Sequence, residues 1–199
     1  NNSSKKNLAT FSLKLLNQRL FTKINIFNKT NETDSIKGNV LVKRNKTRLT
    51  TFFDYKRDKI IFDQANLRNL LFDGKFNGIL ELSPFFQFDL SVDLNAINFN
   101  KVQNLLINLD ETERKNLFNI NKKINGKLNL SSNKIYSKYN LVKSFESRFK
   151  FINGNILVEQ LLLNLGKLGA DDLIGSIKNK KKFFSFKFEK NIFIDNKKY

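Results

Sequence analysis

The strict alternation of apolar and polar residues constrains this chain more than any other feature. It is clearest in residues 85–94, where single polar residues separate Phe86, Phe88, Leu90, Val92 and Leu94. Successive side chains of a β-strand point to opposite faces, so this run predicts a strand with one apolar and one polar face.

Similar runs predict a mainly β chain. Polar turn signals separate them, among them Asp73-Gly74, Asn153-Gly154 and residues 31–35. An Asn-Gly pair between two alternating runs favours a tight hairpin. The sequence therefore predicts an antiparallel meander that forms a curved, open sheet or groove of repeating β units. The predicted strands span residues 11–15, 20–27, 36–43, 48–55, 59–62, 76–82, 85–94, 124–130, 148–152, 155–165, 173–177, 183–188 and 191–194.

Residues 100–119 break this alternation. Apolar residues recur there at helical spacing, and Asp110 followed by Glu113 resembles a capping box at the start of a second helix. We expect two short helices that form a lid over the end of the sheet. A helix that binds a partner protein is the alternative.

A short glycine-containing pattern occurs four times, as IKGNVLV, FNGILEL, INGKLNL and INGNILV. Its glycines are Gly38, Gly78, Gly126 and Gly154, which are expected at the openings of strands. Glycine at such a position permits a bulge, a bend or close approach of another backbone. The recurrence is typical of a β structure built from repeated hairpin-like units.

The composition excludes most familiar enzyme classes. The chain has no cysteine, and its lack of histidine removes the usual general base. The adjacent carboxylates Asp110-Glu111 and Asp171-Asp172 are more typical of solvated turns than of catalysis. We therefore expect no enzymatic activity, no metal site and no cofactor. Because methionine is also absent, we expect a piece of a longer protein.

The net charge of +18, from 36 basic and 18 acidic residues, favours a polyanionic partner when taken alone. However, lysine far outnumbers arginine, and asparagine is also abundant. Both features are expected of a protein encoded by an AT-rich genome. Proteins that bind nucleic acid favour arginine for its paired contacts with phosphate and guanine. Nucleic acid is therefore an unlikely partner, although a basic binding module for nucleic acid or other polyanions stays the alternative function.

The second half of the chain, from about residue 71 to residue 193, resembles the C-terminal region of AsmA-like proteins of Gram-negative envelopes. The most specific likeness is the phrase in which an Asn-Gly strand is followed by LGKLGADDLIGSI. Residues 1–70 carry only the general alternation and are expected to be an N-terminal β segment continuous with the sheet. The matching segments are FDGKFNGILELSPFFQFDLSVDLNAINF from Phe72, INGKLNLSS from Ile124, FKFINGNILVEQLLLNLGKLGADDLIGSIKN from Phe149 and FFSFKFEKNIFID from Phe183.

This resemblance implies a function and a location. AsmA-like proteins resemble bridge-like lipid-transport proteins, in which a long curved sheet forms a groove with an apolar inner face. The resemblance implies that residues 71–199 are a periplasmic β region with a helical insert. The parent protein would be anchored in the inner membrane by an N-terminal helix outside this sequence. It would support phospholipid transport between the inner and outer membranes, or outer-membrane assembly, with a phospholipid or other acyl lipid as partner.

The apolar residues of the alternating runs are the candidates for a lipid-facing groove. The alternative is that the same side chains form the ordinary core of a β-sandwich or of a helix-covered sheet. The candidates are Phe86, Phe88, Leu90, Val92, Leu128, Leu130, Leu161, Leu163, Phe184, Phe186 and Phe188.

Overall fold

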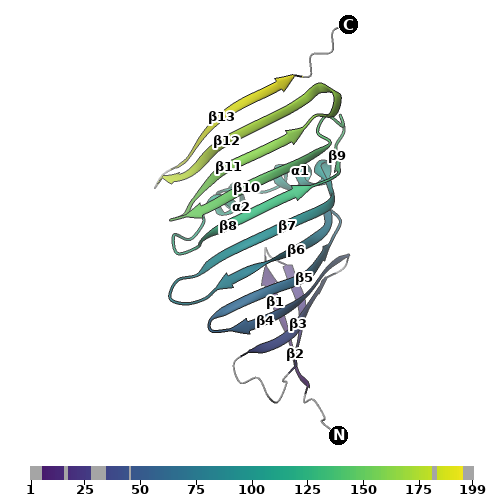
Figure 1. The fold of residues 1–199 in the computed structure, drawn as a ribbon, viewed down its shortest axis with the longest axis vertical. Coiled ribbons are helices and arrows are strands. Elements are labelled where there is room, and N and C mark those ends of the chain that lie inside the picture. The colour runs from purple at the N-terminus through teal and green to yellow at the C-terminus, as the bar shows by residue number, and fades with distance from the viewer. Residues whose placement is uncertain (1–5, 16–17, 28–34, 45, 181–182, 195–199) are drawn as a thin grey trace.

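The computed structural model describes residues 6–15, 18–27, 35–44, 46–180 and 183–194, and these form one long twisted sheet of thirteen strands (Figure 1). Apart from β9, which pairs with β7, the strands lie side by side in the sheet in the same order as in the chain. The mainly β, largely antiparallel class is thus confirmed. The strands are β1 (Lys6–Leu15), β2 (Gln18–Phe27), β3 (Ile36–Arg44), β4 (Thr47–Lys56), β5 (Lys59–Arg68), β6 (Phe72–Glu81), β7 (Gln87–Asn98), β8 (Asn125–Ser132), β9 (Ile135–Tyr136), β10 (Ser144–Ile152), β11 (Asn155–Asn164), β12 (Gly169–Lys180) and β13 (Phe183–Ile194).

The meander is interrupted once, at the pairing of β7 with β8. These strands run parallel, as do β7 and the two-residue β9, whereas all other neighbours among the described strands are antiparallel. Parallel neighbours need a long crossover connection, which the helical insert between β7 and β8 provides. The prediction of an antiparallel meander was therefore wrong at this one junction. The strand predicted at 191–194 is the end of β13 and not a separate strand.

The helical insert consists of α1 (Phe99–Ile107) and α2 (Glu111–Phe118). The predicted capping box is confirmed: the Glu113 amide donates to Asp110 Oδ1 at 2.8 Å, and the Asp110 amide donates to Glu113 Oε2 at 3.1 Å. Neither these helices nor any other in the described ranges has the length and hydropathy of a membrane span.

Two predicted turns had different outcomes. Asn153-Gly154 forms the hairpin between β10 and β11, with positive φ angles of 51° and 78° as a tight type I′ turn requires. Asp73-Gly74, by contrast, lies inside β6, so this turn prediction was wrong. The chain turns instead just before β6, where Asn69 Oδ1 accepts hydrogen bonds from the amides of Leu71 and Phe72. The turn predicted at 31–35 falls, apart from Ser35, outside the described residues.

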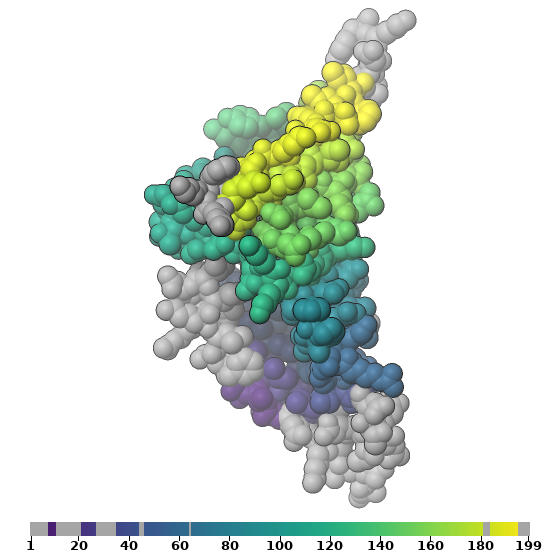
Figure 2. Space-filling view, turned by 90° about the vertical axis from the view of Figure 1, so that its left-hand side faces the viewer, coloured from purple at the N-terminus to yellow at the C-terminus, as the bar shows by residue number. Residues whose placement is uncertain are grey.

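The sheet is strongly curved, and little of it is buried. The teal helical insert projects from one side of the sheet (Figure 2), and in the front view the insert, β1 and β2 all lie behind the other strands (Figure 1), so the sheet curves toward that side. The accessible surface is 15078 Å², against about 9,700 Å² expected for a compact protein of this mass. Among the described residues, only four apolar side chains are buried, those of Ala65, Leu94, Ile135 and Val158.

Candidate functional site: the apolar inner face

The register of the strands aligns apolar residues into continuous rows across the sheet. Directly paired residues lie on the same face, so each row can be followed from strand to strand. The first row, from β3 to β13, comprises Ile36, Tyr55, Ile60, Leu80, Phe88, Gly126, Phe151, Ile156, Ile177 and Phe186. The second, from β2 to β13, comprises Ile26, Gly38, Phe53, Phe62, Gly78, Leu90, Leu128, Phe149, Val158, Gly175 and Phe188.

We call the face that carries these rows the inner face, because the helical insert lies against it. The ring of Phe118 in α2 is centred 5.9 Å from the ring of Phe184 and 5.7 Å from that of Phe186, both on β13. Asn179 Nδ2 also donates to Asn119 Oδ1 at 3.2 Å. These contacts cover the inner face near β13 only in part, since Phe186 remains 53% exposed.

The structure brings ten of the eleven groove candidates onto this face. Phe88, Leu90, Leu128, Phe186 and Phe188 belong to the two rows given above. Phe86 precedes β7, with its ring 6.5 Å from that of Phe88. The remaining candidates on the inner face are Val92, Leu130, Leu161, Leu163 and Phe184.

Sequence reasoning missed several aromatic residues of the same rows, including Phe53, Phe62, Phe149 and Phe151. Their runs were predicted as strands, but no local signal shows which of two alternating sets shares a face with a distant strand. β-bulges in the β4–β5, β5–β6 and β10–β11 pairings also shift the alternation. Only the register of strand pairing shows which of the two alternating sets of side chains lies on the inner face.

Glycines let neighbouring side chains lie flat against the inner face. The rings of Phe88 and Phe151 meet over Gly126, 5.3 Å apart, from the strands on either side. A Cβ on Gly126 would lie 2.6 Å from the Phe88 ring, and one on Gly78 would lie 2.7 Å from Leu90 Cδ2. At both positions a Cβ would also clash with a backbone carbonyl oxygen of β7, so these glycines let both the backbone and the side chains of β7 come close, which an added methyl group would prevent.

The four predicted glycines do not all open strands. Gly38 and Gly126 lie near the starts of β3 and β8, as expected. Gly78, however, is in the middle of β6, because that strand starts four residues earlier than predicted, and Gly154 belongs to a hairpin turn. Gly175 on β12, which was not predicted, lies under the Phe188 ring in the same way as Gly126 under Phe88.

One ion pair interrupts the apolar inner face. Lys190 Nζ on β13 lies 2.7 Å from Asp171 Oδ2 on β12, and the two side chains are 51% and 10% exposed. Asp171 lies on the inner face because it is paired with Leu163. Its other oxygen, Oδ1, is buried without a hydrogen-bond partner among the described residues.

The opposite face, which we call the outer face, is polar and carries charges of both signs. Lys59 and Glu81 pair across it at 2.6 Å, and Lys37 and Asp54 at 3.7 Å. On the inner face, by contrast, Tyr55 stands at the end of the first row, beside the β4–β5 turn. Its phenol donates a hydrogen bond to the Asp58 carboxylate at 3.0 Å, which raises the pKa of Tyr55.

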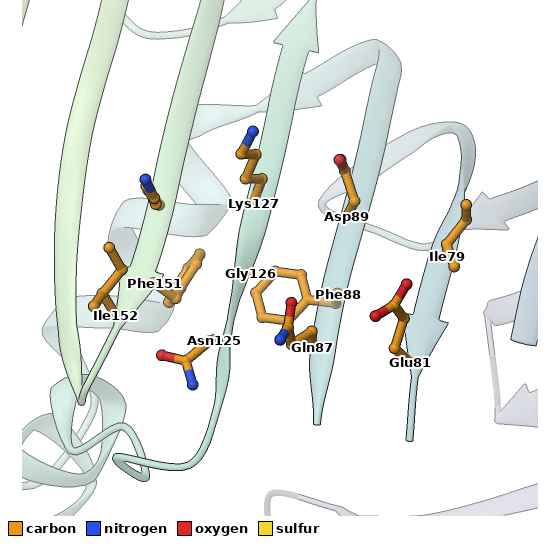
Figure 3. A pocket seen from close by; sticks show the side chains of 11 residues that line it. Ile79, Glu81, Gln87, Phe88, Asp89, Asn125, Gly126, Lys127, Phe151 and Ile152 are labelled. Carbon is orange, nitrogen blue, oxygen red and sulfur yellow. The ribbon is translucent and has the colours of Figure 1, made fainter. Parts of the chain in front are cut away.

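A hollow of about 370 Å³ lies on the outer face where β6, β7, β8 and β10 meet (Figure 3), since most of its lining residues, among them Glu81, Asp89 and Lys127, belong to that face. Phe88 and Phe151 reach toward each other across Gly126, while Asp89 and Lys127 extend along neighbouring strands from the polar face. This lining combines apolar contact with scattered charge. It offers packing and hydrogen bonding but contains no nucleophile paired with a base, which covalent catalysis requires.

Comparisons of the chain with protein-family models, with curated proteins and with solved structures found no match. The chemistry of the inner face is therefore the main basis for assigning a function.

Proposed function

We propose that this chain is a non-enzymatic, lipid-holding segment of an AsmA-like envelope protein on the periplasmic side of the inner membrane. In this proposal, acyl chains of phospholipids lie along the inner face during transport between the inner and outer membranes or during outer-membrane assembly. The observation that carries the proposal is the continuity of the apolar rows across a sheet whose inner side chains are mostly half-buried.

The dimensions of the rows suit an acyl chain. Neighbouring strands lie about 4.8 Å apart, so the row from β3 to β13 is on the order of 40 Å long. One leaflet of a bilayer contributes about 15 Å of hydrocarbon thickness. A full acyl chain therefore fits along a row with space for others. Each CH₂ transferred from water to such a surface contributes about 0.8 kcal/mol, without any requirement for a specific polar contact.

The neighbouring residues Phe52 and Phe53 of β4 provide a direct test. Phe53 belongs to an inner-face row, whereas Phe52 is paired with Asp63 on the outer face and is 51% exposed. We would replace each in turn with the photo-crosslinking amino acid benzoylphenylalanine in the full-length parent protein in cells. Irradiation should attach phospholipid at position 53 and not at position 52, as measured by mass spectrometry of the purified protein. Equal labelling at both positions, or none at either, would contradict the proposal.

A second experiment changes the chemistry of one face at a time. Leu90 and Leu128 are direct partners on the inner face of β7 and β8, and Ser91 and Asn129 are direct partners on the outer face of the same strands. The double variant Leu90→Asp with Leu128→Asp should lose most of the phospholipid that co-purifies with the parent protein, because acyl chains avoid charge. The matched control Ser91→Asp with Asn129→Asp should retain it. Circular dichroism should show intact β structure in both; if only the inner variant unfolds, those leucines are ordinary core.

A further inference from the structure

The loop around β9 combines exposed aromatic residues with lysines. We call residues 133–143 the Tyr–Lys loop; it contains two of the four tyrosines of the chain, Tyr136 and Tyr139. Tyr139 is 74% exposed and Leu141 is 55% exposed. Large apolar groups left in water beside cationic groups are typical of surfaces that contact a membrane interface, where tyrosine is enriched.

The local charge is strongly one-sided. From residue 114 to residue 145 the chain has no aspartate or glutamate and has eight lysines or arginines. Lys134, Lys138 and Lys143, all in the Tyr–Lys loop, form no ion pair with a carboxylate of the described residues. Lys134 and Lys138 instead lie over the rings of Tyr136 and Tyr139, at 4.9 and 5.4 Å from the ring centres. This concentration of positive charge differs from the outer face, where Lys37 and Lys59 pair with carboxylates.

The first turn of α1 continues this surface. The Lys138 amide donates to Asn100 Oδ1 at 3.0 Å, which holds the loop against the start of the helix, and β9 pairs with the end of β7. Figure 1 places β9 and α1 at the same end of the strands. The exposed Phe99 and the cationic Lys101 belong to this turn. Between loop and helix lies a hollow of about 500 Å³, lined by amide groups and by Lys134 and Lys143.

We propose that the Tyr–Lys loop and the first turn of α1 form a docking surface for an anionic phospholipid bilayer. The lysines attract the negatively charged headgroups, and Phe99, Tyr139 and Leu141 enter the interface between headgroups and acyl chains. Exposed leucine and phenylalanine favour a bilayer over nucleic acid, as does the absence of arginine from the loop. The surface is separate from the apolar rows of the inner face, so this proposal does not rest on the lipid-holding function.

The test measures binding of the full chain to vesicles by flotation. The chain should bind vesicles of equal parts phosphatidylglycerol and phosphatidylcholine and should not bind pure phosphatidylcholine. In Lys134→Gln with Lys138→Gln, binding should weaken roughly 10- to 30-fold, since each lysine near an anionic leaflet contributes about 1 kcal/mol. The matched control Lys56→Gln with Lys75→Gln removes the same charge from exposed lysines elsewhere and should weaken binding less than about twofold. Equal weakening by both pairs would overturn the proposal.

A fluorescence experiment tests insertion itself. The chain contains no tryptophan, so Tyr139→Trp introduces a single reporter at the centre of the surface. Its emission should shift to the blue, and iodide should quench it less, when phosphatidylglycerol vesicles are added. Phe52→Trp on the outer face, also half-exposed, should show neither change. An unshifted emission from the Tyr139→Trp variant, or binding of a single-stranded oligonucleotide at this loop in place of vesicles, would overturn the proposal.

Discussion

The inner and outer faces of this sheet are formed by alternate residues of the same strands. They differ in which residues lie next to their large apolar side chains. On the inner face such groups stand next to one another, as Phe88 and Phe151 do over Gly126. On the outer face polar residues interrupt such groups within a strand or two: Phe52 is opposite Asp63, and the directly paired Ile61 and Ile79 lie between Asp54 and Asp89. The difference teaches that an uncovered apolar surface is made by alignment across strands, and not by apolar content alone.

The largest expected effect comes from adding side-chain volume at adjacent positions on the two faces. Gly126→Val places methyl groups where the Phe88 ring lies and should destabilise the fold by about 2–3 kcal/mol. Lys127→Val, one residue further along β8 and on the outer face, should change the free energy of unfolding by no more than about 0.5 kcal/mol. Urea unfolding of both variants measures the difference. Equal costs would mean that the inner face is not packed over its glycines.

An intermediate effect is expected from ion pairs on the two faces. Lys190→Gln leaves the Asp171 carboxylate, which is 10% exposed, without its partner and should cost about 1–2 kcal/mol. Lys59→Gln removes the partner of Glu81, whose side chain is 37% exposed, and should cost less than about 1 kcal/mol. Thermal or urea denaturation at neutral pH provides the comparison. A larger cost for Lys59→Gln would contradict the more enclosed character of the inner pair.

The smallest effect concerns the helical cover of the inner face. Lys115 Nζ lies 2.7 Å from Glu111 Oε1, and this hydrogen bond and charge lower the pKa of Glu111 below its ordinary value of 4.5. A lowered folded-state pKa stabilises α2 above the unfolded pKa, and the contribution is lost as the pH falls through the folded pKa. Helical chemical shifts of α2 should therefore weaken in acid, and Glu111→Gln should make them less dependent on pH. Helix α1, which has no carboxylate, serves as the internal control.

The sequence allowed prediction of those features that depend on neighbours in the chain. Alternation located nearly every strand, and the spacing of Asp110 and Glu113 located the start of α2. The parallel pairing of β7 and β8 could not be predicted, because it joins strands separated by the whole helical insert. Asp73-Gly74 was mistaken for a turn because this glycine serves tertiary packing: a Cβ there would lie 2.9 Å from Leu94 Cδ2. Both errors concern contacts between residues that are distant in the sequence.

In the described part of the chain, the extensive contacts between strands all join neighbours in the strand order. A structure of this kind grows by addition: one further hairpin would lengthen each row by roughly 10 Å without disturbing strands elsewhere. Its stability is close to a sum of terms between adjacent strands. Among the described strands, β1 and β13 pair with a neighbour on one side only. Opening of this stretch of sheet should therefore begin at those two strands and spread inward strand by strand. In a sheet of this kind, the number of hairpins determines the length of the apolar rows.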